Sequence, residues 1–449
     1  MPLTIEKLIY GGDGLARLPA DGRGRGKAVF VPFVLAEEKI EATLVQQKSG
    51  FARARVNQIV EASPHRIAPA CPYFARCGGC NYQHTNYEHQ LEIKKEILRE
   101  NLRRIAKIEL PCEIEAHPSP PWNYRNRSRL QVRIAPEFAV GYFKFGSHQL
   151  LPVEACPISS PLINRGIAAL WQAGRNGNAP AGLRDIELFA NAEDTELLVA
   201  ISCTVEAKRS SVKAWGEELR AAMPEIAGVT AFRETQPSKR GATHETLLSL
   251  GENHLIYQTQ SATYRVSAGS FFQTNRHLTD ELVKIVTRGQ AGEMALDLYA
   301  GVGLFSTAMA CDFRHIVTVE PSQTAFADLK YNLPKNGKAI EATAEQYLSG
   351  RQKGEAGIEE SGSETALPGG TREPDFVVVD PPRSGLGERV ARAVADMGAS
   401  RIAYVSCDPA TLARDLVLLL SAGYRIDRAH LVDLFPQTYH LETVMHLSR

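Results

Sequence analysis

Hydrophobic and polar residues alternate in short runs over residues 1–62, and glycines separate the first runs. Three of these runs read KAVFVPFVL, KIEATLVQQ and FARARVNQIVEA. Alternation with a period of two is typical of a β-strand with one buried face. Several such strands in succession predict a small β-barrel of the OB type. The spacing leaves open whether this barrel is purely structural or binds RNA.

The pattern is mixed in the middle of the chain. In residues 90–105, apolar residues recur three and four positions apart within a charged segment, which predicts an amphipathic helix. Residues 161–255 combine helical and strand patterns. We therefore expect residues 63–255 to form a central α+β domain.

From about residue 256 the rhythm changes to strand, loop and helix, as in MALDLYAGVGLF, DFVVVDPPR and RIAYVSCDPATLARDL. This alternation predicts an open, mostly parallel α/β sheet that binds its ligands at the carboxyl ends of the strands. Residues 256–449 are thus expected to form a Rossmann-like domain. Residues 349–374 are rich in Gly, Ser, Glu and Pro and predict a surface insertion without chemistry. The expected fold class is multidomain α/β.

Length, charge and composition limit the number of domains, the binding partners and the cellular compartment that we expect. At 449 residues the chain is too long for one hydrophobic core, and its formal charge of zero means that any nucleic-acid binding depends on local patches. The N-terminus lacks the pattern of a signal peptide, and no stretch approaches the ~20 apolar residues of a membrane helix. We expect a monomeric, cytoplasmic protein without membrane contact. In the cytoplasm its eight cysteines stay reduced and are first considered as ligands or nucleophiles.

A candidate cofactor loop follows the strand in LDLYAGVGLF, residues 296–305. Gly301 and Gly303 would let the backbone approach a ligand closely. The next strand ends in Glu320, where a carboxylate suits the two hydroxyls of an adenosine ribose. The dinucleotide glycine pattern is incomplete, which favours a nucleoside without a pyrophosphate, and S-adenosylmethionine fits best. The alternative is a simple turn with a solvated acid at Glu320.

A candidate nucleophile stands in AYVSCDPATLARDL, residues 403–416. Cys407 ends an apolar strand, and Asp408-Pro409 starts a helix. The positive end of the helix should lower the pKa of the thiol below its usual value of about 8.5. A buried packing cysteine is the alternative. Addition of this thiolate to C6 of uracil would make C5 nucleophilic enough to take a methyl group, after which a base must remove the C5 proton.

Two residues of DLFPQTYHLETV, 433–444, could be that base. Phe435, Tyr439 and Leu441 could desolvate the carboxylate of Glu442 and make it more basic. His440 is the competing base, and the pattern does not choose between them. In VVVDPPRSGL, Asp380 ends a further strand, and the two prolines after it form a rigid wall beside which a ligand could bind.

A second cysteine set begins in CPYFARCGGC. Cys71, Cys77 and Cys80 need a fourth ligand, and Cys156 is the candidate because it also precedes a proline. Four thiolates suit tetrahedral zinc or a [4Fe–4S] cluster, and the spacing leaves both open.

A basic stretch, PWNYRNRSRLQVR at 121–133, is the candidate RNA contact. Arg125, Arg127 and Arg129 share one strand parity, and Trp122 and Tyr124 could stack on a base. This combination is typical of single-stranded RNA binding, although a solvated strand face is the alternative. The target base must be flipped out or lie in a loop.

Five segments in order carry a resemblance to a known family: SFFQTN at 270–275, DLYAGVGLF, VVVDPPRSGL, YVSCDPATLARDL and FPQTYHLETV. They resemble the motifs of the RNA uracil-C5 methyltransferases, and most closely the RumA-type branch that acts on 23S rRNA. The resemblance covers nearly the whole chain. It implies that Cys407 is the nucleophile, Glu442 the base and His440 a supporting residue. It also implies that four residues contact S-adenosylmethionine: Gln273, Tyr299, Glu320 and Asp380.

The same resemblance implies a TRAM domain for residues 1–62, a [4Fe–4S] cluster at the four cysteines and 5-methyluridine in 23S rRNA as the product. The rRNA expectation follows from domain composition, because the bacterial tRNA-modifying branch typically lacks the barrel and the cluster. Ala300 and Leu304 depart from residues found in some relatives. Three alternatives stay open: a tRNA uracil-C5 methyltransferase, an amino methyltransferase of adenine or guanine, and a non-catalytic iron–sulfur RNA-binding protein.

Overall fold

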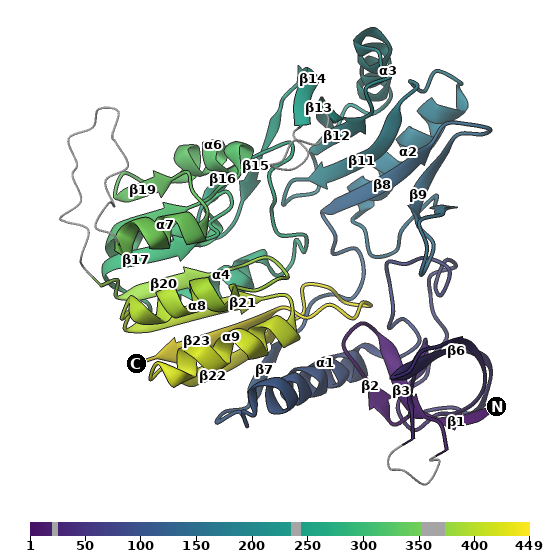
Figure 1. Cartoon of the computed structure of the whole chain (residues 1–449). Helices are drawn as coiled ribbons and strands as arrows, with labels where there is room; N and C mark the ends of the chain where they lie inside the picture. Colours follow the sequence, from purple (N-terminus) through teal and green to yellow (C-terminus); the bar gives the residue numbers. More distant parts are fainter. Residues whose placement is uncertain (20–25, 235–243, 353–372) are drawn as a thin grey trace.

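The computed structural model of the chain describes residues 1–19, 26–234, 244–352 and 373–449. Figure 1 shows a small curved sheet near the N-terminus, a separate central sheet and a layered α/β body that contains the C-terminus. Most of the insertion expected at 349–374 lies outside the described residues. In the part that the structure describes, no helix has the length and apolar character needed to cross a lipid bilayer.

The strands expected in residues 1–62 are present. Within the described residues they form a six-stranded sheet in the order β1-β5-β6-β4-β3-β2, which curls round on itself in Figure 1. The predicted alternation is visible in β4, where Val29 and Val31 are fully buried. They pack with other inward residues into a small core of their own. The strands are β1 (Pro2–Thr4), β2 (Lys7–Leu8), β3 (Asp13–Arg17), β4 (Ala28–Pro32), β5 (Lys39–Gln47) and β6 (Phe51–Glu61).

The central sheet has the order β10-β9-β8-β11-β12-β13-β14 in the described part of the chain. Neighbouring strands in this sheet pair in antiparallel fashion, except that β12 and β13 pair in parallel with each other. Two helices, α2 (Pro161–Arg175) and α3 (Arg209–Ala222), pack on it and complete its core. The strands are β8 (Arg127–Arg133), β9 (Ala139–Phe143), β10 (Leu150–Pro152), β11 (Leu183–Ala190), β12 (Leu197–Cys203), β13 (Ile226–Glu234) and β14 (His244–Gly251).

The C-terminal sheet confirms the predicted α/β architecture. Its order, over the residues that the structure describes, is β19-β18-β17-β20-β21-β23-β22-β7. The strands from β19 to β21 are parallel, and β23 runs antiparallel to both of its neighbours. The strands are β17 (Gly292–Leu298), β18 (Phe313–Val319), β19 (Gly337–Ile340), β20 (Phe376–Val379), β21 (Arg401–Ser406), β22 (Arg425–Val432) and β23 (Thr443–Ser448).

The central strands β20 and β21 of this sheet are apolar and almost entirely buried, whereas β22 begins with exposed charged residues. All four residues of β20 are buried, as expected for a central parallel strand. A hairpin, β15 (His254–Gln258) with β16 (Thr263–Ser267), precedes the sheet. The helical elements are α4 (Thr279–Thr287), α5 (Leu304–Ala308), η2 (Met309–Cys311), α6 (Gln323–Asn332), α7 (Ala344–Gln352), α8 (Gly387–Asp396) and α9 (Pro409–Ser421).

The predicted domain boundaries need correction. The helix expected at 90–105 is present as α1 (Tyr87–Asn101), continued by η1 (Leu102–Ala106), but it packs against α9 of the C-terminal body. Strand β7 (Ile114–His117) pairs in parallel with β22 and forms the edge of the C-terminal sheet. Assigning all of residues 63–255 to a central domain was therefore wrong. The boundary at 255/256 also falls inside β15, because a hairpin connects the two bodies.

Candidate active site

The register of two antiparallel strands brings the predicted nucleophile and base together. Ser406, the last residue of β21, pairs with Thr443, the first residue of β23. Cys407 follows the first and Glu442 precedes the second, so both residues leave the sheet at the same end. The hydroxyl of Thr443 also donates a hydrogen bond to the carbonyl of Ser406 at 3.1 Å. This end is the carboxyl end of the parallel strands, where ligands of α/β sheets bind.

Cys407 is half-buried, and burial raises the pKa of its thiol to about 12, with further contributions from the carboxylates of Glu442 and Asp380. The lowered pKa expected from the sequence was wrong. Asp408 caps the helix that follows, because its carboxylate accepts hydrogen bonds from the backbone N–H groups of Ala410 and Thr411 at 3.0 Å each. The free N–H groups at the positive end of the helix thus bind the carboxylate of Asp408, so they do not stabilise the Cys407 thiolate.

Glu442 is only 6 % exposed, and burial raises its pKa well above the usual value, with a further contribution from Asp380. The predicted desolvation of this carboxylate is confirmed. His440 is engaged differently. Its Nδ1 lies 2.8 Å from Nη2 of Arg383, which can only donate, so this ring nitrogen accepts. Burial and Arg383 lower the pKa of His440 to about 3. This geometry favours Glu442 over His440 as the base.

Asp380 directly follows β20 and joins the same group of acids. Burial, together with the nearby Asp297, raises its pKa to about 7. Asp297, fully buried in β17, accepts hydrogen bonds from the backbone and the hydroxyl of Ser306. Arg383 is the cation that acts electrostatically on both Cys407 and Glu442. The carboxylates of Asp297, Asp380 and Glu442 are thus electrostatically coupled, each to the next, and Arg383 acts on Glu442.

The glycine-rich loop after β17 has the backbone that its residues require. Gly303 has a φ of +92°, and a Cβ there would lie 2.9 Å from a methyl group of Leu329. Tyr299 also has a positive φ of 67°. The N–H of Gly301 donates to one carboxylate oxygen of Glu320 at 2.9 Å, and Ser322 donates to the other at 2.7 Å.

Glu320 is therefore a buried residue, 8 % exposed, and the alternative of a solvated strand-end acid is wrong. Each of its carboxylate oxygens keeps a further lone pair that could accept a ligand hydroxyl. Ligand contacts by Tyr299, Gly301, Gly303, Glu320 and Asp380 stay predictions.

The SFFQTN segment lies between β16 and α4 and connects several parts of the molecule. The hydroxyl of Ser270 donates to the buried carboxylate of Asp328 at 2.6 Å. The side-chain amide of Asn275 donates to the carbonyl of Leu434 at 3.1 Å. These bonds hold the loop that carries Gln273, whose side chain is 7 % exposed. Its contact with a cofactor stays a prediction.

Three residues that support the site were missed in the sequence. The hydroxyl of Tyr10, from the N-terminal sheet, donates to the backbone carbonyl of Cys407 at 2.9 Å. Lys94 of α1 forms a fully buried ion pair with Asp433 at 2.6 Å, which holds the segment before Glu442. Arg383 is the arginine of the VVVDPPRSGL motif, so its place beside Asp380 could have marked it as a site residue. Nothing in the local pattern marks Tyr10 or Lys94, because their partners lie more than 300 residues away.

The four predicted cysteine ligands come together. Cys71, Cys77, Cys80 and Cys156 line one cavity of about 50 Å³. This is several times the ~10–15 Å³ that one water molecule needs. Burial, with contributions from the neighbouring thiols Cys156 and Cys71, raises the pKa of Cys77 to about 11. The prediction that Cys156 joins the other three cysteines is supported by this placement.

The predicted arginine face is largely wrong. Arg127 is buried, donates to the carbonyl of Ser270 at 2.6 Å and lies over the ring of Phe189 at 4.1 Å. Arg125 lines the cysteine cavity instead of a solvent-exposed face. Of the three, Arg129 alone is open to solvent, with 61 % of its side chain exposed. Tertiary contacts cover the strand where its sequence implies an open basic surface.

Comparison with known proteins identifies the family. The sequence model described as tRNA (uracil-5-)-methyltransferase matches residues 86–449. That match covers well over half of the chain. The chain belongs to the tRNA (uracil-5-)-methyltransferase family. The resemblance seen in the sequence motifs is thereby confirmed.

Relatives of this methyltransferase match over its whole length. An RNA methyltransferase of Aquifex aeolicus is 32 % identical and covers 99 % of this chain and 97 % of its own. The 23S rRNA (uracil(1939)-C(5))-methyltransferase RlmD of Chromohalobacter salexigens is 33 % identical and covers 100 % of this chain and 89 % of its own.

A solved structure shares the fold. The tRNA (uracil-54, C5)-methyltransferase of Pyrococcus abyssi, in complex with S-adenosyl-L-homocysteine, has a TM-score of 0.72 at 24 % identity, with both chains fully covered. The protein is thus an RNA uracil-C5 methyltransferase with a mixed α/β fold.

Proposed function

We propose that this methyltransferase converts a uridine of 23S rRNA to 5-methyluridine through a covalent bond between Cys407 and the pyrimidine. The observation that supports the mechanism is the pairing of Ser406 with Thr443, because it brings Cys407 next to the buried carboxylate of Glu442. The full-length similarity to a 23S rRNA methyltransferase supports the choice of RNA. A tRNA substrate is the second candidate, and the description of the matching family model favours it.

The proposed reaction uses Cys407 and Glu442 in sequence. The Cys407 sulfur bonds to C6 of uracil, and the C5–C6 π electrons move towards C5 and O4. C5 would take its methyl group from bound S-adenosylmethionine, whose methyl–sulfur bond would break as S-adenosylhomocysteine leaves. Glu442 then removes the proton from C5, the C5–C6 double bond re-forms, and the bond between sulfur and C6 breaks. Arg383 lies where it favours the ionised forms of both residues.

The pKa directions predict that the methylation rate increases with pH. Burial raises the pKa of Cys407 to about 12 and that of Glu442 above its usual value, so both functional anions are scarce at neutral pH. Below its pKa, the thiolate fraction grows up to about tenfold per pH unit. Single-turnover methylation rates between pH 6 and 9 should rise accordingly. RNA binding measured over the same range is the control, and a rate that falls with pH would contradict this assignment of the anions.

The RNA substrate is tested by mapping modified nucleotides. Mass spectrometry of 23S rRNA and tRNA from cells that lack the gene should show one or more 5-methyluridines missing from 23S rRNA only. Addition of the purified enzyme and S-adenosylmethionine to that rRNA should restore them. Loss of 5-methyluridine from tRNA alone would reject the rRNA proposal and favour the tRNA alternative.

We also propose that Cys71, Cys77, Cys80 and Cys156 hold a [4Fe–4S] cluster with a structural, RNA-positioning role. Thiolates around zinc lie about 3.8 Å apart, given a metal–sulfur distance of about 2.3 Å. Among the described residues, however, the cysteines provide no group of three whose sulfurs all lie within 4.8 Å of one another. The wider arrangement fits a polynuclear cluster better than one metal ion.

Removal of one cysteine ligand tests this cluster. Cys80→Ser is expected to lose most of the iron and acid-labile sulfide of the anaerobically purified protein, together with its visible iron–sulfur absorption. Cys311→Ser is the matched control, because Cys311 is an exposed free thiol. Wild-type protein that contains one zinc and no iron would reject the cluster.

The N-terminal sheet, residues 1–62, is proposed to be a TRAM-type RNA-binding module. Its curved six-stranded form, in the described residues, and the bond from Tyr10 to Cys407 support a role beside the catalytic loop. Arg129, although paired with Asp185 and Glu187, is the solvent-exposed member of the three arginines and could meet a phosphate by exchanging these partners. We further propose that the enzyme acts as a monomer in the cytoplasm.

A further inference from the structure

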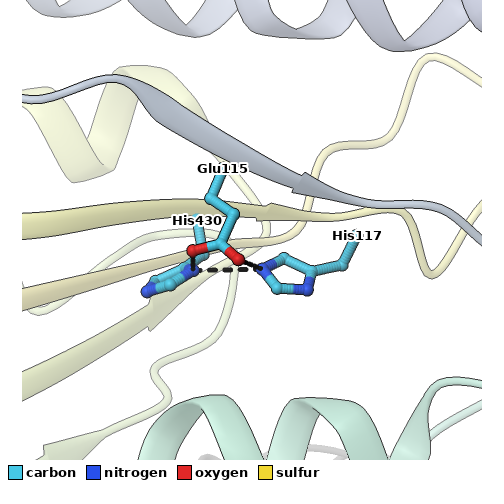
Figure 2. A group of neighbouring side chains, drawn as sticks. All are labelled: Glu115, His117 and His430. Atoms are coloured by element: carbon cyan, nitrogen blue, oxygen red, sulfur yellow. Dashed lines mark hydrogen bonds and ion pairs between the residues drawn. The ribbon is translucent and has the colours of Figure 1, made fainter.

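Three side chains meet where β7 joins the methyltransferase sheet, as Figure 2 shows. Glu115 of β7 is the register partner of His430 on β22. His117 lies two residues further along β7, so its side chain points to the same face as that of Glu115. Both histidine rings and the carboxylate converge on one point. No step of the methyl transfer uses this group.

The distances within the group are those of ligands around a metal ion. Nε2 of His117 lies 3.1 Å from Nδ1 of His430. The carboxylate oxygens of Glu115 lie 3.4 Å from Nδ1 of His430 and 3.8 Å from Nε2 of His117. Bonds of about 2.0–2.1 Å in a tetrahedron place ligand atoms about 3.3–3.4 Å apart. The three observed separations, two of which involve different oxygens of the Glu115 carboxylate, bracket this value.

A second carboxylate orients one of the histidines. Nδ1 of His117 lies 3.1 Å from an oxygen of Glu281 on α4. The carboxylate can only accept, so Nδ1 carries the proton and Nε2 directs its lone pair into the group. A carboxylate behind a ligating histidine is the usual arrangement at zinc sites. The charges of Glu115 and Glu281 would balance those of a divalent cation.

We propose that Glu115, His117 and His430 bind one divalent transition-metal ion, with Zn²⁺ as the best match to two imidazoles and one carboxylate. The side chains of His117 and His430 are 12 % and 7 % exposed, whereas that of Glu115 is 67 % exposed. The ion therefore enters from solvent on the Glu115 side, and water completes its coordination.

The ion would clamp β7 to β22 close to the catalytic base. The backbone N–H of Val432, two residues after His430, donates to the carbonyl of Glu442 at 2.8 Å, and the N–H of Asp433 donates to the carbonyl of His117 at 3.0 Å. A metal ion bound between β7 and β22 would therefore also restrain the backbone of Glu442, which is hydrogen-bonded to β22. His117, His430 and Glu115 are positioning residues in this proposal.

The test uses the full-length protein with its cysteine ligands unchanged. Co²⁺ and Zn²⁺ are titrated into wild type, His117→Gln, Glu115→Gln and Glu281→Gln, with His148→Gln as the control because His148 is exposed in the turn between β9 and β10 of the central sheet. Wild type and the control should bind one ion more than His117→Gln, and the bound Co²⁺ should show d–d bands without thiolate charge-transfer absorption. Glu281→Gln should bind about 10- to 100-fold more weakly.

A second readout separates metal binding from general damage. In wild type, Zn²⁺ should slow hydrogen exchange of the amides in residues 114–117 and 429–432, and in His117→Gln it should have no effect. Equal ion stoichiometry and affinity in wild type and both His117→Gln and Glu115→Gln would overturn the proposal. So would bound Co²⁺ whose absorption comes only from thiolate ligands.

Discussion

Replacement of Cys407 by alanine is expected to slow methyl transfer to RNA by at least about 10⁴-fold, the scale of loss seen when a covalent nucleophile is removed. Uracil C5 is a weak nucleophile until a thiolate adds to C6, and no other cysteine is expected at this site. Glu442 and Asp380 would still be present, but without the sulfur adduct they have no acidic C5 proton to remove. Binding of S-adenosylmethionine should persist, because no predicted cofactor contact is altered.

The measurement is single-turnover transfer of a labelled methyl group, with cofactor binding followed separately by calorimetry. Cys311→Ala is the control, because its thiol is exposed and lies in η2 rather than at the strand end. RNA that carries 5-fluorouridine adds a second readout. It should trap the wild-type protein as a covalent complex and fail to trap Cys407→Ala. Wild-type rates in Cys407→Ala would reject covalent catalysis.

The local sequence pattern predicted many candidate site residues of this enzyme, because these residues lie directly after the ends of buried strands. A buried parallel strand is apolar along its length, so the residue that ends it is visible in the sequence. Asp380, Glu320 and Cys407 were all found in this way. Their expected convergence follows from the rule that parallel strands share one carboxyl edge. The proximity of Glu442 required the β21–β23 register, which is a long-range pairing.

The local sequence pattern did not predict the pKa of Cys407, the burial of Arg127 or the pairing of β7. The position of Cys407 before a helix indicated a lowered pKa, yet Asp408 occupies the helix N–H groups, and Glu442 and Asp380 act in the opposite direction. Arg127 has the parity of an exposed strand residue, but the ring of Phe189 covers it. Four-residue strand β7 has too little sequence for its pairing with β22 to be read. The Asp408 cap is local and stands in the sequence beside Cys407, whereas the effects of Glu442, Asp380, Phe189 and β22 depend on residues distant in the chain.

Glu442→Gln should convert the enzyme into one that becomes trapped on its RNA. The amide keeps the shape of the buried side chain but cannot remove the C5 proton, so the methylated adduct has no route to elimination. The Cys407–C6 bond should still form, and one methyl group per enzyme should transfer. Turnover is expected to fall about 10²- to 10⁴-fold. A large share of the protein should migrate as a covalent RNA complex in denaturing gels.

Two variants decide whether the trapped complex has this origin. Glu345→Gln changes an exposed glutamate, 51 % exposed, and should neither trap RNA nor slow turnover. The double variant Cys407→Ala/Glu442→Gln should not trap RNA, because the bond depends on the sulfur. Rapid multiple turnover by Glu442→Gln would exclude Glu442 as the base and return His440 to consideration. In the proposed reaction, the proton leaves C5 only after the methyl group has been added. Trapped RNA without a methyl group would therefore show that Glu442 is needed before methyl transfer and would contradict its assignment as the C5 base.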